Sequence, residues 1–146
     1  MKSLEQKAEE LMLEVHKGQT RNDGITPYSE HIYDVVKVVK ELGGSYHEIQ
    51  VAYLHDCVED YEGISSEIER KIHDIFGHEI LNDVLALTHL KGIPYQDYID
   101  SMLNKEEVLL VKLADLIVNL TDKPRKDRLK DYKLAIIKVI KNLYYL

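Results

Sequence analysis

Apolar residues recur at helical spacing through the whole chain, and no stretch alternates with the period of two that is typical of strands. In the first segment, Leu4, Ala8, Leu11 and Val15 share one face and predict a helix that ends at about Lys17. The following stretch, "QTRNDGITPYSEH", carries Asn, Asp, Gly and Pro in close order and predicts a loop with turns.

Seven more segments have helical spacing, and each is bounded by turn or capping residues. Ser66 and Glu69 have the spacing of a capping box and predict that one of these helices begins there. No linker, internal repeat or low-complexity tract interrupts the pattern, so we expect one all-α domain over residues 1–146. The predicted helices cover about 29–43, 45–57, 66–76, 78–90, 94–103, 106–120 and 127–145.

One predicted helix, "EEVLLVKLADLIVNL", is apolar nearly all round and should lie in the centre of the fold. Lys112, Asp115 and Asn119 occur in it at spacings of three and four, so they share one face. A carboxylate in an apolar setting requires a compensating cation, which is either a side chain such as Lys112 or a bound metal. The pattern of this helix leaves both possibilities open.

A second polar cluster stands in the otherwise apolar stretch "AYLHDCVED", where Glu59 and Asp60 follow His55 and Asp56 by one helical turn. Buried charges of this kind need a partner. The chain contains a control, the other His-Asp pair in "ERKIHDIFGH" at residues 73–74, which no acidic pair follows. We expect the control pair to lie on the surface.

His31 follows the Gly/Pro-containing loop and completes a set of two histidines and two aspartates with His55, Asp56 and Asp115. A lone helical histidine is more often a packing residue, but this mixed set suits Mn²⁺, Fe²⁺ or Zn²⁺ and leaves coordination positions open for water. A metal of this kind lowers the pKa of water and polarises a phosphoryl oxygen. The set therefore indicates phosphoester or phosphoanhydride hydrolysis.

Glu59 and Asp60 are the candidates to orient the attacking water or to take its proton. Lys112, Arg21 and Lys17 are candidates to neutralise phosphate charge.

Composition restricts the partners. The chain has 146 residues, of which 45% are hydrophobic and 31% charged, as in an ordinary globular domain. Its net charge of −7 argues against non-specific nucleic-acid binding, and no apolar run approaches the length of a membrane span. The single cysteine, Cys57, cannot form an internal disulfide, so we expect a cytoplasmic protein.

The same residues resemble a known family. "HKGQTRNDGITPYSEH", "LHDCVED", "IFGHEI" and "VKLADLIVNL" are similar, in this order, to motifs of the HD-domain metal-dependent phosphohydrolases. The resemblance is closest to the hydrolase domain of RelA/SpoT-type alarmone enzymes and their small homologues, and it covers residues 5–125.

This resemblance implies an HD-domain bundle of seven to eight helices that uses Mn²⁺ to remove the 3′-pyrophosphate from guanosine tetra- or pentaphosphate. It carries metal ligation over to His31, His55, Asp56 and Asp115, water activation to Glu59 and Asp60, and substrate binding to Arg21 and Asn119.

At three positions the chain departs from the family: Leu116 and Thr20 stand where basic residues are common, and Val118 stands where His is frequent. The nucleotide therefore stays open. The alternatives are another HD phosphohydrolase, acting on a deoxynucleoside monophosphate, a nicotinamide dinucleotide phosphate or a cyclic nucleotide, and a non-catalytic nucleotide-binding module. We rank the hydrolase above the module because no ligand or acidic residue is missing.

Several further residues have two interpretations. Tyr28 and Tyr98 stack on a nucleotide or only pack in the core. Tyr144 and Tyr145 belong to a homodimer surface or to the rim of the core. A basic cluster after the central helix is most often solvated surface, with phosphate contact as the alternative. This basic cluster consists of Lys123, Arg125, Lys126 and Arg128. We assign no role to the remaining histidines at positions 16, 47, 78 and 89.

Overall fold

The computed structural model describes residues 1–145, and its α-helices confirm the all-α class. No strand occurs among the residues described. The elements are α1 (Leu4–Val15), α2 (Tyr28–Glu41), α3 (Tyr46–Leu54), α4 (Ser65–Phe76), α5 (His78–Ala86), α6 (Tyr95–Met102), α7 (Glu106–Thr121), the 3-10 helix η1 (Lys126–Arg128) and α8 (Leu129–Tyr144).

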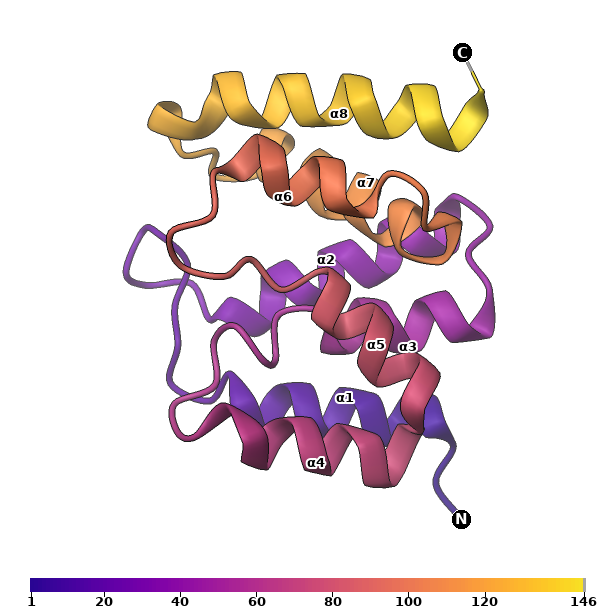
Figure 1. Ribbon diagram of the computed structural model, residues 1–146. Coiled ribbons are helices and arrows are strands. Elements are labelled where there is room, and N and C mark those ends of the chain that lie inside the picture. The colour runs from indigo at the N-terminus through magenta and orange to yellow at the C-terminus, as the bar shows by residue number, and fades with distance from the viewer. Residues whose placement is uncertain (146) are drawn as a thin grey trace.

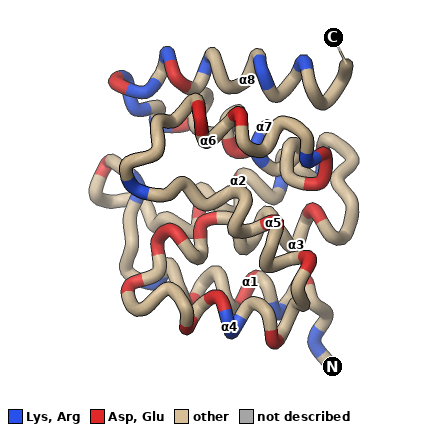
Figure 2. The backbone as a smooth tube through the Cα atoms, viewed as in Figure 1, with Lys and Arg blue, Asp and Glu red and all other residues tan. Residues whose placement is uncertain are grey.

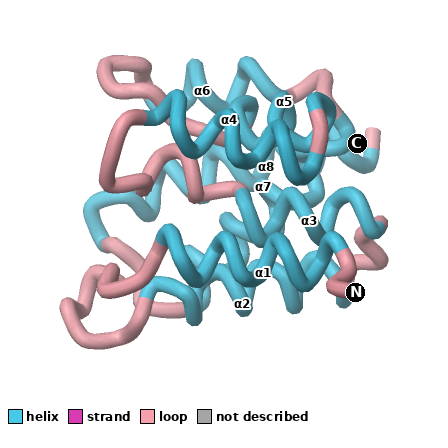
Figure 3. The backbone as a smooth tube through the Cα atoms, turned by 90° about the horizontal axis from the view of Figure 1, so that it is seen from below, coloured by secondary structure: helices cyan, strands magenta, loops and turns pink. Residues whose placement is uncertain are grey.

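The helices stack in layers (Figure 1), with α8 at the top, α6 and α7 beneath it, α2, α3 and α5 in the middle, and α1 and α4 at the bottom. Several connecting loops gather at one side of this stack, on the left of Figures 1 and 3. They include the loops that follow α1, α3, α5 and α7. The candidate site lies among these loops.

Helix α7 is the centre of the bundle and packs against α2, α3, α5 and α8. All of residues 108–116 and also Val118 are buried, as the apolar composition of this segment predicted. Two of the buried residues, Lys112 and Asp115, are charged. Burying a charged side chain among apolar residues is unfavourable unless an opposite charge or a hydrogen bond compensates it, so these two residues require partners around α7.

Two helices end earlier than their patterns predicted. α3 stops at Leu54 instead of about residue 57, and the chain then turns through hydrogen bonds from the Cys57 N–H to the Leu54 carbonyl and from the Asp60 N–H to the Asp56 carbonyl. α5 stops at Ala86 instead of about residue 90. Both early ends place loop residues beside the candidate site.

The predicted capping box at Ser66 and Glu69 is wrong, because α4 begins at Ser65 after Ile64 and has no side-chain cap. Capping boxes do form at the starts of α1 and α3, where Ser3 pairs with Gln6 and Ser45 with Glu48.

Charged residues of both signs are spread over most helices, and Lys residues recur along α8 (Figure 2). Within residues 1–145, no helix combines the length and the apolar content that a bilayer crossing requires.

Candidate metal centre and its surroundings

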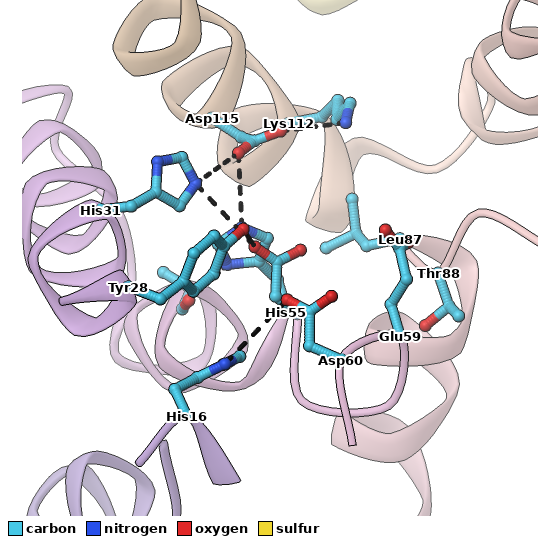
Figure 4. Close-up of polar contacts among 12 residues, drawn as sticks. His16, Tyr28, His31, His55, Glu59, Asp60, Leu87, Thr88, Lys112 and Asp115 are labelled. Carbon is cyan, nitrogen blue, oxygen red and sulfur yellow. Dashed lines mark hydrogen bonds and ion pairs between the residues drawn. The ribbon is translucent and has the colours of Figure 1, made fainter. Parts of the chain in front are cut away.

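Three elements bring the four predicted ligands together. His31 projects from the first turn of α2, His55 and Asp56 follow the end of α3, and Asp115 lies on α7. One ligand atom from each of these residues lies within 4.8 Å of the others. Residues separated by up to 84 positions in sequence therefore form one compact cluster (Figure 4).

Both imidazoles direct Nε2 toward the carboxylates of the cluster. His31 Nε2 lies 3.0 Å from Asp115 Oδ1 and 3.8 Å from Asp56 Oδ2. His55 Nε2 lies 3.3 Å from Asp56 Oδ2 and 3.4 Å from Asp115 Oδ1. Imidazole nitrogens and carboxylate oxygens that converge in this way are a donor set for a divalent transition ion.

Hydrogen bonds with neighbouring groups orient the side chains of the cluster and leave the atoms that face one another available to a metal. The His55 Nδ1–H donates to the Ala52 carbonyl at 2.6 Å, while His55 Nε2 is buried without a hydrogen-bond partner. A second-shell carbonyl on one ring nitrogen is the usual way to present the other nitrogen to a metal. The Tyr28 hydroxyl donates to Asp56 at 2.6 Å. These side chains therefore fit a divalent ion.

Lys112 occupies the other side of Asp115, with Nζ 3.0 Å from Oδ2, while Oδ1 faces the histidines. Burial by itself raises the pKa of Asp115, but the charge of Lys112 and the close approach of the His31 and His55 imidazoles more than offset it, so the pKa lies well below its usual range. Asp115 thus stays ionised in the core, and its Oδ1, which faces the two histidines, is the oxygen that could bind a cation. Of the two compensating cations considered for Asp115, the structure shows Lys112 in contact with Oδ2. This contact leaves Oδ1 on the side where a metal would bind.

Glu59 and Asp60 lie in the turn directly after the ligands. Glu59 accepts a hydrogen bond at 2.7 Å from the backbone N–H of His89, which is available because α5 ends early. Burial and the neighbouring charges of Asp56 and Glu59 raise the pKa of Asp60 to about 7. A carboxyl group with this pKa can exchange a proton with water near neutral pH.

His16, to which the sequence assigned no role, caps the C-terminal end of α1, and its side chain is buried. Its Nδ1 lies 2.8 Å from Gln19 Oε1. The same nitrogen lies 4.0 Å from Asp60 Oδ2 (Figure 4). Gln19 also donates to the Asp60 carbonyl at 2.8 Å. The loop after α1 thus supports the acidic turn, a contact that the spacing of "HKGQ" alone does not reveal.

A cavity of about 300 Å³ opens beside the cluster. Of the predicted substrate residues, Arg21, Tyr28, Lys112 and Asn119 line it. Lys17 does not: it is exposed and borders other hollows, so its predicted phosphate contact is not supported by its position. The remaining lining residues are Asn22, Asp56, Glu59, Leu87, His89, Tyr95, Tyr98, Asp115, Lys123, Arg125, Arg128 and Tyr132.

The three departures from the family do not line this cavity. Leu116 and Val118 are buried in the core on α7, and Thr20 is exposed in the loop before α2. The predicted surface position of the control pair His73–Asp74 is confirmed, with side-chain exposures of 54% and 67%.

Residues 8–144 match the family model described as HD domain. The guanosine-3′,5′-bis(diphosphate) 3′-pyrophosphohydrolase MESH1 of Xenopus tropicalis is 32% identical, over 89% of this chain and 79% of its own length. The protein of the same name from Danio rerio is 31% identical, over 75% of this chain and 63% of its own length.

A guanosine-3′,5′-bis(diphosphate) 3′-pyrophosphohydrolase of Vibrio cholerae is 26% identical over 73% of this chain, which spans only 16% of that longer protein. A solved structure described as a metazoan ortholog of SpoT that hydrolyses ppGpp shares the fold, with a TM-score of 0.75 and 23% identity. That match covers 98% of this chain and 86% of the solved one.

Proposed function

This chain belongs to the HD-domain family, and we propose that it hydrolyses guanosine 3′,5′-bis(diphosphate) by removing the 3′-diphosphate with the aid of a divalent metal. The observation that carries the proposal is the convergence of two histidines and two aspartates within 4.8 Å, with an acidic pair in the next turn. The relatives named for this activity support the choice of substrate.

We propose His31, His55, Asp56 and Asp115 as the metal ligands and Mn²⁺ as the ion, because a mixed imidazole and carboxylate set suits it. When bound, such an ion supplies Lewis-acid chemistry: it lowers the pKa of water and polarises a phosphoryl group.

Asp60 is the proposed proton acceptor. It lies in the turn directly after the ligands and takes a proton from the attacking water as the new oxygen–phosphorus bond forms. Glu59, held by the His89 N–H, orients that water. The bond between phosphorus and the 3′ oxygen then breaks, diphosphate leaves, and the 3′ oxygen takes up a proton. The products are guanosine 5′-diphosphate and inorganic diphosphate.

Tyr28, Asn119 and Arg21 are the proposed substrate contacts, since each lines the cavity beside the cluster. Arg21 is 8% exposed, and its Nε is buried without an acceptor, so it has donor capacity for a phosphate oxygen. The buried free thiol of Cys57 supports the cytoplasm as the proposed compartment.

The test is release of phosphate and diphosphate from a substrate panel, with Mn²⁺ or with chelator. The panel holds guanosine 3′,5′-bis(diphosphate), a nicotinamide dinucleotide phosphate and deoxynucleoside monophosphates. We expect metal-dependent diphosphate release from the guanosine compound. Release from another member alone would move the proposal to that substrate, and silence across the panel would favour a nucleotide-binding module.

Two variants test the assignments. Asp115→Ala should lose bound metal and activity together, whereas Glu59→Gln should keep the metal and lose turnover. Activity in a metal-free Asp115→Ala protein would contradict the mechanism.

A further inference from the structure

Helix α8 forms the outermost layer of the fold, and the described residues leave one of its faces uncovered (Figure 1). The inner side, which contains the buried residues Ala135 and Val139, packs against α6 and α7. The exposed residues of the opposite side recur at spacings of three and four, so they share one face. We call this surface the basic face, and it consists of Lys130, Lys133, Leu134, Ile137, Lys141 and Tyr144.

The positive charge of the basic face is not neutralised within residues 1–145. In this part of the chain none of its three lysines forms an ion pair, and no acidic residue is exposed on α8. The single carboxylate of the helix, Asp131, pairs with Arg128 at 3.5 Å. The apolar members of the face are between 43% and 50% exposed. In a chain with a net charge of −7, this face is therefore a local positive surface with apolar area.

A hollow of about 820 Å³ has the opposite charge. It lies beside the starts of α3, α5 and α7, and its lining contains five carboxylates against Lys105 and the partly exposed His47. We call this surface the acidic hollow, and its carboxylates belong to Glu48, Glu79, Asp83, Glu106 and Glu107.

Local structure accounts for only part of this negative charge. Three of the carboxylates contact His47, the Ser45 N–H and the Tyr145 hydroxyl. Each helix start adds roughly half a positive charge, so three starts offset only about one and a half of the five carboxylates. Glu79 and Glu107 form no ion pair within the described part of the chain. The hollow therefore keeps negative charge that a cationic partner surface would neutralise.

The basic face and the acidic hollow adjoin at the end of α8. Glu106 and Glu107 line the acidic hollow and also a neighbouring depression, which Lys141 and Tyr145 line from the side of α8. A positive and a negative surface thus lie side by side on one molecule. A two-fold axis between them places the basic face of each of two copies on the acidic hollow of the other. Such an interface is self-complementary and closes as a dimer.

We propose that a second copy of this chain binds here and forms a two-fold dimer, with the basic face of each copy on the acidic hollow of the other. Direct packing of two α8 helices would bring lysines together, and like charges across an interface are unfavourable. The proposed dimer also covers Leu134, Ile137 and Tyr144. It is independent of the proposed function, because neither surface contains a residue of the metal cluster or of the site cavity.

The experiment measures the assembly of the full chain by sedimentation equilibrium, at low ionic strength and at about 1 M salt, where the Debye length falls to about 3 Å. We expect a reversible dimer whose dissociation constant rises by at least about tenfold with salt, because its charge pairs are screened. A wild-type chain that stays monomeric at about 100 µM would overturn the proposal.

Charge reversal identifies the two surfaces. Lys133→Glu/Lys141→Glu reverses the basic face, and Glu79→Lys/Glu107→Lys reverses the acidic hollow. Each variant alone should dimerise at least about tenfold more weakly than wild type, because like charges then meet. An equal mixture restores opposite charges at both contacts, so we expect a dimer with one copy of each variant, detected by native mass spectrometry.

The matched control, Lys7→Glu/Lys37→Glu, reverses two exposed lysines on α1 and α2 and should leave dimerisation unchanged. Circular dichroism checks the fold of every variant. If the reversed hollow does not fold, Glu79→Gln/Glu107→Gln replaces it and should also weaken the dimer. A dimer that neither reversal weakens, or a mixture of folded variants that stays monomeric, would overturn the proposal. So would a monomer that binds vesicles of anionic lipid through the basic face, since that face would then bind a membrane.

Discussion

The ion pair between Lys112 and Asp115 allows the energetics of the site to be tested without a substrate. Lys112 is 7% exposed and Asp115 6%, and Nζ lies 3.0 Å from Oδ2. The ammonium group also lies 5.0 Å from the ring centre of Tyr98. In Lys112→Met, a side chain of similar volume fills the space, so the main change is the loss of the cation beside a buried carboxylate.

Breaking a buried pair by removing one partner destabilises a protein by roughly 3–5 kcal/mol, because the remaining charge is left uncompensated. His31 and His55 still contact Asp115, so we expect the lower limit, about 3 kcal/mol, for Lys112→Met in chelator. For a chain of this size, that loss lowers Tm by about 6–12 °C. The control Lys126→Met, at an exposed position, should stay within about 0.5 kcal/mol of wild type.

The assay is urea and thermal unfolding of the wild type and both variants, in chelator and in Mn²⁺. A metal at Asp115 Oδ1 replaces part of the lost positive charge, so Mn²⁺ should raise the Tm of Lys112→Met more than that of wild type. If Lys112→Met in chelator is as stable as Lys126→Met, the pair does not compensate the buried carboxylate. An equal Mn²⁺ effect in wild type and Lys112→Met would refute the claim that lysine and metal share Asp115.

Three further outcomes are expected. Tyr28→Phe removes the hydroxyl that donates to Asp56 at 2.6 Å, and should weaken Mn²⁺ binding, measured by calorimetry, by about tenfold or more; an unchanged affinity would contradict a supporting role. Gln19→Ala removes the hydrogen bond to the Asp60 carbonyl and should lower kcat about tenfold at constant Mn²⁺ affinity, whereas the neighbouring Thr20→Ala should not. Because the pKa of Asp60 is about 7 in the fold, above its ordinary value of 3.8, the folded chain binds this proton more tightly than the unfolded chain, and stability from this group falls as pH rises from about 4 to 7. In chelator, the free energy of unfolding of Asp60→Asn should therefore rise by about 1–2 kcal/mol relative to wild type as the pH goes from about 4 to 7. This value is smaller than the full pKa shift implies, because the Asp60 side chain is 31% exposed. Stability curves of the two proteins that run parallel with pH would be evidence against the raised pKa.

The periodicity of the chain predicted the helices well where one face had to be buried. α7 is the clearest example, because a segment that is apolar on nearly all sides is stable only in the centre of a bundle. Helix ends were predicted less well. α3 and α5 stop three or four residues early, and the chain continues in turns closed by local backbone hydrogen bonds, which the periodicity of apolar residues does not register.

The cluster of two histidines and two aspartates could also be predicted from the sequence, since charged residues in apolar helices must find partners and the four candidates were few. Their closeness could not be read from spacing alone, because they lie in three different segments of the chain. The burial of His16, the His89 contact to Glu59 and the exclusion of Lys17 from the cavity had no local signal.

The sequence by itself determined the helical class, the buried position of α7 and the residue types of the candidate cluster, because helical periodicity and the cost of burying charge act over short segments. Only the tertiary structure decided which loops meet at the site. The loops after α1, α3, α5 and α7 converge there (Figure 1), and their contacts join residues up to 101 positions apart, such as Arg21 and Asp122. The packing of whole helices sets those contacts, and so it selected Arg128 and left Lys126 outside the cavity.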